Sequence, residues 1–92
     1  MRIAQSVQRI IAPELLRLRA GVLVTVVRVE VSKDLHAAQV HYAVTGADHA
    51  EVQEQLEEMT GGLRRKLAKG LATKKVPTVS FIAALEPGDG RP

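Results

Sequence analysis

The residues best suited to bind a ligand form a basic run that begins with two adjacent glycines. Between Thr60 and Val76 the chain has six cations and no acid. Clustered Lys and Arg side chains neutralise phosphates, and glycine allows another backbone to come close. The run therefore predicts an RNA-binding surface formed by Gly61, Gly62, Arg64, Arg65, Lys66, Lys69, Lys74 and Lys75.

A segment of opposite charge precedes this run. Ala47 to Met59 holds five acids and no cation. Acids in the first turns of a helix and cations in its last turns complement the helix dipole, each by a few tenths of a kcal/mol up to about 1 kcal/mol. A solvated helix face without a partner is therefore the alternative interpretation, although dipole matching alone does not require six cations.

Composition limits both the size of the core and the kind of contact. The 92 residues predict one small domain over residues 1–85, and a disordered, breaker-rich tail over residues 86–92. The chain has one Phe, one Tyr and no Trp, so its core is aliphatic and it lacks the aromatic platform of many single-strand binders. The net charge of +3 favours an anionic partner, contacted through phosphates and shape.

No catalytic or metal site emerges from the residue types. His36, His41 and His49 have spacings that match no familiar metal site, and there is no cysteine. Ser32, Lys33 and Asp34 are better explained as a turn, because Ser and Asp commonly bond local backbone. We therefore expect a non-enzymatic protein that needs no cofactor and no metal.

Neither a membrane span nor a secretory signal is expected. The longest uncharged apolar run, Ala20 to Val27, is too short to cross a bilayer, and the N-terminus lacks a secretory apolar region. The absence of cysteine fits a reducing compartment. We expect a cytoplasmic monomer that does not associate with membranes.

The elements that must position the basic run follow from hydrophobic periodicity. An amphipathic helix is expected from Ile3 to Leu18, either kinked at Ala12 or followed by a second short turn that starts at Pro13. An antiparallel hairpin should follow, since two alternating segments flank a short polar turn. Its first strand should present Val27, Val29 and Val31 on one face, and its second Ala38, Val40, Tyr42 and Val44.

A long helix and a third strand complete the predicted fold. Asp48, with Glu51 three residues later, predicts the start of the helix, and its apolar stripe runs from Val52 to Leu71. The glycine pair should break or kink this helix, since each glycine costs a helix interior roughly 1 kcal/mol. With a strand over residues 76–82, the order is α-β-β-α-kink-α-β, an α+β fold whose helices cover one face of a three-stranded sheet.

The hairpin carries a family resemblance. Residues 24–42 resemble the central motif of ribosome-binding factor A, in which a Thr-Val strand leads through Val-x-Val-Ser-x-Asp-Leu to a second strand with Ala-x-Val-x-Tyr. The opening Arg2-Ile3-Ala4-Gln5, Gly61 with Arg64, and Lys74-Lys75-Val76-Pro77 are similar to flanking features of that family. The resemblance extends over about residues 2–85.

The resemblance implies a KH-like domain of type II topology with one parallel strand pair. It also implies an assembly factor that contacts small-subunit ribosomal RNA and the immature small subunit. Two further cations are candidates for the RNA surface, Lys33 at the hairpin tip and Arg9 on the first helix. No G-x-x-G loop lies near the glycine pair, so four-nucleotide readout of the usual KH kind is not expected.

Two rival functions stay open at this point. A protein-interaction domain could pair through its open sheet edge or an apolar helix face, with its basic charge incidental. A general KH-like single-strand binder outside the ribosome would bind unstructured oligonucleotides as tightly as structured ribosomal RNA.

Overall fold

The fold is described from a computed structural model, which describes residues 3–16, 18, 20–71 and 75–84. Two helices and three strands follow one another in the order α1-β1-β2-α2-β3. Their bounds are α1 Ile3–Leu15, β1 Leu23–Val31, β2 Ala37–Thr45, α2 His49–Gly70 and β3 Thr78–Ala83. This is the predicted α+β fold. The predicted tail over residues 86–92 lies outside the described residues.

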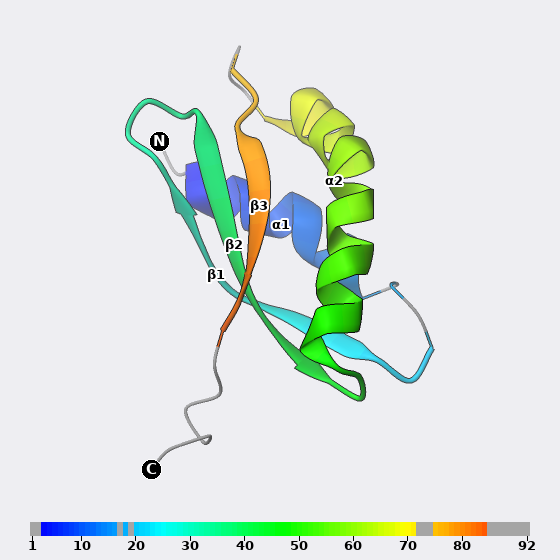
Figure 1. Ribbon diagram of the computed structural model, residues 1–92. Coiled ribbons are helices and arrows are strands. Elements are labelled where there is room, and N and C mark those ends of the chain that lie inside the picture. Colours follow the sequence, from blue (N-terminus) through cyan, green and yellow to red (C-terminus); the bar gives the residue numbers. More distant parts are fainter. Residues whose placement is uncertain (1–2, 17, 19, 72–74, 85–92) are drawn as a thin grey trace.

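The three strands form one mixed sheet in the order β1-β2-β3. β1 and β2 pair antiparallel, as the hairpin prediction requires, and β2 and β3 pair parallel. Both helices lie on the same side of the sheet, with α1 against β1 and α2 against β3 (Figure 1). The opposite face of the sheet is open, which confirms the predicted layer order.

A β-bulge in β1 corrects the predicted alternation of that strand. Val26 pairs with Tyr42 and Arg28 pairs with His41, so Val27 is an extra residue without a partner position. Val26 and Val29 are buried, whereas Val27 is 50% exposed. The prediction that Val27 shares the buried face was wrong, because one extra residue reverses the facing of the strand at that point.

The long helix α2 begins where predicted but is not divided at the glycine pair. Asp48 is its N-cap, and its side chain accepts a hydrogen bond from the amide of Ala50 at 3.4 Å. The helix continues without interruption through Gly61 and Gly62 to Gly70 (Figure 1). The predicted break is therefore corrected to one continuous helix, whereas the other alternative, a kink at the glycines, stays a prediction. Burial of the apolar stripe on both sides of the glycines offsets their intrinsic cost.

The first helix also differs from its prediction in one detail. α1 continues through Pro13 and ends at Leu15, and no second turn starts at the proline. The amide of Leu16 still donates to the carbonyl of Ala12 at 3.3 Å. Because only two helical residues follow Pro13, the backbone bond that proline removes lies in the last turn, where its loss costs least.

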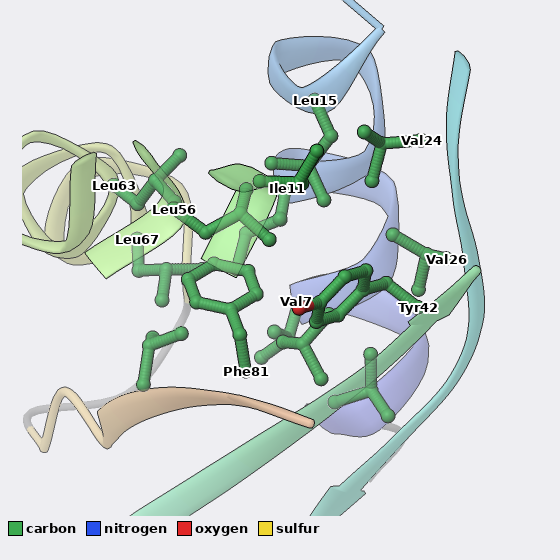
Figure 2. Packing of buried hydrophobic residues seen from close by; sticks show 14 of the residues in the cluster. Val7, Ile11, Leu15, Val24, Val26, Tyr42, Leu56, Leu63, Leu67 and Phe81 are labelled. Carbon is green, nitrogen blue, oxygen red and sulfur yellow. The ribbon is translucent and has the colours of Figure 1, made fainter. Parts of the chain in front are cut away.

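The core lies between the helices and the covered face of the sheet. Val7, Ile11 and Leu15 from α1 meet Leu56, Leu63 and Leu67 from α2, with Val24, Val26, Tyr42 and Phe81 contributed by the strands (Figure 2). The rings of Tyr42 and Phe81 pack edge to face, with centroids 6.2 Å apart. Both aromatic side chains are therefore inside the molecule, and neither is available to stack on a ligand.

A partly buried polar network at the edge of this core connects α2 to the sheet. The Tyr42 hydroxyl donates to Oε1 of Gln53, and Nε2 of Gln53 donates to the carbonyl of Phe81 at 3.0 Å and to Glu57 at 2.9 Å. Gln53 thus joins β2, β3 and α2. Side-chain networks in a low dielectric fix one arrangement of the packed elements.

Tyr42→Phe is expected to lower the free energy of unfolding by about 1–2 kcal/mol, because it leaves Oε1 of Gln53 without its donor. A double-mutant cycle in urea with Gln53→Leu should give a coupling free energy of about 1 kcal/mol. Strictly additive effects would contradict a direct bond between the two side chains.

The same tyrosine makes stability depend on alkaline pH. Burial, and then the nearby Glu57 carboxylate, raises the pKa of Tyr42 above its ordinary value of 10.0. Above pH 10 the unfolded chain ionises first, so stability should fall as pH rises from there toward the folded pKa, and Tyr42→Phe should remove this fall. As Tyr42 is the only tyrosine, tyrosinate absorbance reports its ionisation alone.

Candidate RNA interface

Four residues of the basic run share one exposed stripe of α2. Gly61, Arg64, Arg65 and Ala68 are spaced by three, one and three positions, which places them on one helix face. Together with Val76, from the segment that leads into β3, they line an open hollow of about 420 Å³. We refer to this as the glycine–arginine hollow. Arg64 and Arg65 are exposed at its rim.

The charge of this hollow is not neutralised within the described part of the chain. Arg64, Arg65 and Lys69 are exposed and form no ion pair with any described residue. Lys66 differs, since its Nζ lies 3.5 Å from Oε2 of Glu14 on α1. An ion-paired lysine contributes less to anion binding than an unpaired one, so the two arginines carry most of the available positive charge near the glycines.

The two glycines belong to different surfaces. Gly62 lines a second hollow of about 330 Å³ between α1 and α2, together with Glu14, Glu58, Met59, Leu63, Arg65 and Lys66. That surface mixes acids with cations, whereas the glycine–arginine hollow has cations alone among its charged residues. The sequence predicted one site containing both glycines. In the structure, adjacent positions of the helix point in different directions, so Gly61 and Gly62 line different hollows.

Neither glycine is required by packing inside the protein. A Cβ built at Gly61 or at Gly62 would meet nothing within 4 Å. Gly70 is the contrasting case, since its Cβ would lie 2.7 Å from Cδ1 of Ile10 on α1. The close approach of the two helices is therefore made at Gly70, and the surface beside Gly61 is open to a partner.

The remaining predicted cations lie on α1, on α2 and in two connecting segments, or outside the described residues. Arg9 is exposed on α1 and precedes Ile10, whose side chain lies beside Gly70. Lys69 is exposed on α2 and precedes Gly70. Lys75 is exposed next to Val76. Lys33 is exposed in the turn of the hairpin. Lys74 lies outside the described residues.

The turn that carries Lys33 is held by its neighbours. The Ser32 hydroxyl donates to Oδ1 of Asp34 at 2.7 Å and accepts from the amides of His36 and Ala37 at 3.1 and 3.0 Å. Leu35 adopts a positive φ of 63° inside this turn. The structural interpretation of Ser32 and Asp34 is confirmed, and it gives a physical reason for the Ser-x-Asp-Leu pattern.

Ser32→Ala is expected to lower the free energy of unfolding by about 1–2 kcal/mol, because it removes one donor and one shared acceptor from the turn. Lys33→Ala is the matched control in the same turn and should change stability by less than about 0.5 kcal/mol. Equal effects of the two substitutions in chemical denaturation would contradict the proposed stabilisation of the turn by the hydrogen bonds of Ser32.

Acid should weaken the same turn. The bond from Ser32, and then the amide of His36, hold the pKa of Asp34 below its ordinary value of 3.8. The contribution of Asp34 to stability is therefore present above pH 3.8 and is lost as pH falls through the lower folded value. In Ser32→Ala, the pKa of Asp34 read by NMR titration should move back toward 3.8.

Two of the three histidines make local contacts in the structure. Nδ1 of His36 lies 3.1 Å from Asp34, and Nε2 of His41 lies 3.2 Å from Glu30 on the open sheet face. Over the part of the chain that the structure describes, no three His, Asp or Glu side chains are grouped to hold a metal ion. Within the same residues, no helix is long and apolar enough to cross a bilayer.

Sequence reasoning missed two lining residues of the hollow. Ala68 lies seven positions after Gly61 and four after Arg64, so the helical period could have placed it on the stripe. Val76 has no such signal, since it reaches the hollow only through the return of the chain toward β3. Both side chains are apolar, so the lining of the hollow offers apolar contacts in addition to the charge that binds a phosphate.

Comparison with known proteins places this arrangement in a family. Residues 1–86 match the family described as ribosome-binding factor A. The chain is 37% identical over 94 residues to ribosome-binding factor A of Micrococcus luteus, covering 94% of this chain and 62% of that protein. The chain therefore spans less than two thirds of that relative's length.

Two structures share the fold. The crystal structure of ribosome-binding factor A from Thermus thermophilus aligns with a TM-score of 0.77 at 22% identity, covering 88% of this chain and 91% of that one. A homology model of the Thermus thermophilus factor, fitted into the cryo-EM map of its 30S complex, aligns with a TM-score of 0.74 at 22% identity, covering 86% of this chain and 88% of that one. With the family match over nearly the whole sequence, the α+β, KH-like fold and the hairpin motif have one explanation: this chain belongs to the ribosome-binding factor A family.

Proposed function

We propose that this chain binds small-subunit ribosomal RNA and acts as an assembly factor for the small ribosomal subunit. The observation that carries the proposal is a pair of exposed arginines, Arg64 and Arg65, that form no ion pair with any described residue and lie beside a glycine that no internal packing requires. Family membership supports the choice of partner, since a relative from Thermus thermophilus is described in a 30S complex.

Binding draws its free energy mainly from charge. Each phosphate that an arginine or lysine neutralises releases counterions, so affinity falls steeply with salt. We assign the phosphate contacts to Arg64, Arg65 and Lys69, with Arg9, Lys33, Lys74 and Lys75 extending the footprint. Lys66 is assigned a smaller share because Glu14 already pairs with it.

The factor acts by occupying and positioning RNA. We propose a non-enzymatic, cytoplasmic monomer whose preferred partner is the immature small subunit. Residence on the particle holds or shields a segment of ribosomal RNA while the subunit matures.

Anisotropy titrations with a fluorescent small-subunit ribosomal RNA transcript at several salt concentrations test the RNA contact. The expected plot of log affinity against log salt is linear with a negative slope of several units. A slope near zero, or affinity no higher than for a neutral polymer of equal length, would contradict the proposal.

One observation favours a second candidate, a protein-interaction domain. Leu23, Val27 and Ile82 are large apolar residues exposed on strands β1 and β3. Association of two copies through this open side would appear in sedimentation equilibrium as a concentration-dependent mass. A constant monomer mass together with salt-dependent RNA binding would exclude it.

A further inference from the structure

We propose that the glycine–arginine hollow receives one unpaired nucleotide of the bound RNA. Its phosphate lies at the arginines, and its sugar or base packs on the apolar residues of the lining. This inference rests on the proposed function, because it presumes that RNA is the partner. It adds the kind of RNA element that the site takes, a single-stranded nucleotide in place of a regular duplex.

Gly61 lowers the stability of the helix in which it lies. Glycine in a helix interior is less favourable than alanine by about 1 kcal/mol, and a Cβ at position 61 would meet nothing within 4 Å. The protein therefore carries a destabilising residue that its own packing does not require. A side chain at position 61 would occupy the hollow, because Gly61 is one of its lining residues.

The lining of the hollow combines charge with apolar surface. Phosphates alone would need only the arginines, yet Gly61, Ala68 and Val76 also line the hollow. Unpaired nucleotides present a sugar and a base face that pack on apolar groups and on guanidinium planes, whereas paired nucleotides are already stacked and present mainly phosphates and 2′-hydroxyls. A volume of about 420 Å³ falls within the usual range of small-molecule sites.

No aromatic ring lines the glycine–arginine hollow. Tyr42 and Phe81, the only Tyr and Phe of a chain without Trp, are 0% and 5% exposed. Within this hollow, the planar contact for an unpaired base comes from arginine, which stacks on aromatic rings as lysine cannot. Among the described residues, Arg64 and Arg65 are the charged residues that line the glycine–arginine hollow.

The test compares Gly61→Leu with Gly62→Leu. Both replace a helix glycine by a strong helix former, so both should raise the melting temperature. A leucine at position 61 enters the glycine–arginine hollow, and a leucine at position 62 enters the second hollow. The two variants thus separate the effect on the helix from the effect on the site.

Binding is read by competition against a fluorescent small-subunit ribosomal RNA transcript, using an unstructured oligoribonucleotide and a fully paired hairpin of the same length as competitors. For the unsubstituted chain and for Gly62→Leu, the oligonucleotide should compete at a concentration at least about tenfold lower than the hairpin, as expected when one good contact is involved. Gly61→Leu should lose this preference while keeping its salt dependence.

Arg64→Lys combined with Arg65→Lys separates planar contact from charge. The expected result is an unchanged salt slope with a lost preference for the unpaired competitor. If the unsubstituted chain binds the transcript but prefers neither competitor, or if Gly61→Leu keeps the preference, the inference is overturned and the RNA-binding function stands. If the unsubstituted chain does not bind the transcript, the proposed function itself fails.

Discussion

Replacement of both Arg64 and Arg65 by glutamate is expected to weaken binding to small-subunit ribosomal RNA by at least about 100-fold at low salt. Each lost phosphate contact should account for about tenfold, because charge reversal replaces attraction by repulsion at an exposed position that forms no ion pair with any described residue. The slope of log affinity against log salt should become less negative by about two units, one for each contact. Titrations at several salt concentrations measure both quantities.

Arg28→Glu is the control for charge reversal outside the hollow, and it changes the net charge by half as much as the double variant. Arg28 lies on β1, where its Nε is 3.4 Å from Oε2 of Glu30, and it does not line the glycine–arginine hollow. Its reversal should lower affinity only slightly and leave the salt slope within about half a unit. An unchanged slope in the double arginine variant, or an equal loss in Arg28→Glu, would show that the basic charge acts in bulk and that the stripe on α2 is not the contact.

Gly46→Ala is expected to lower the free energy of unfolding by at least about 3 kcal/mol, enough to unfold a marginal domain. Gly46 follows β2 at a φ of 97°, and a Cβ there would overlap the carbonyl oxygen of Gly21, in the connection between α1 and β1. An L-residue pays about 1–2 kcal/mol for the left-handed backbone, and displacing a backbone oxygen adds to that cost. Urea denaturation or the soluble yield would report it.

Gly21→Ala is the matched control for Gly46→Ala. Gly21 also has a positive φ, of 80°, but a Cβ there would meet nothing within 4 Å. Its substitution should cost only the conformational share, about 1–2 kcal/mol. Equal losses at the two positions would contradict the close approach of the two turns, which brings the start of β1 beside the end of β2.

Local patterns predicted most of the fold because most of its elements obey one period. The alternation of Ala38, Val40 and Tyr42 indicated the buried face of β2, and the three side chains are buried. Asp48 marked the start of α2, and Gly70 its end. The bulge at Val27 escaped prediction because it depends on which residues of β2 pair across from it, and no local residue type signals that register.

The uninterrupted course of α2 shows the limit of propensity. Two adjacent glycines argue for a break when the helix is considered alone, but the buried Leu56, Leu63 and Leu67 extend the same apolar stripe on both sides of them. Tertiary packing determined the outcome. Sequence reasoning weighed the local cost of the glycines and had no measure of the burial that offsets it.

The candidate site was predicted as a basic run along the sequence, and in the structure it is a stripe on one face of α2. Charge along the chain identified Arg64, Arg65 and Lys66 together, whereas in the structure both arginines line the glycine–arginine hollow, Arg65 also lines the second hollow, and Lys66 pairs with Glu14 of α1. That pairing depends on how α1 crosses α2, which the sequence does not specify. Val76 likewise joins the hollow through tertiary structure alone.

The most direct test of the central claim is co-sedimentation of the purified chain with immature small subunits, mature small subunits and large subunits, at low and moderate salt. The expected result is enrichment on small subunits, strongest on the immature form, and its loss in the variant with Arg64 and Arg65 replaced by glutamate. Equal binding to all three particles, or retention of the preference in that variant, would contradict the assignment of this chain as a small-subunit assembly factor acting through the stripe on α2.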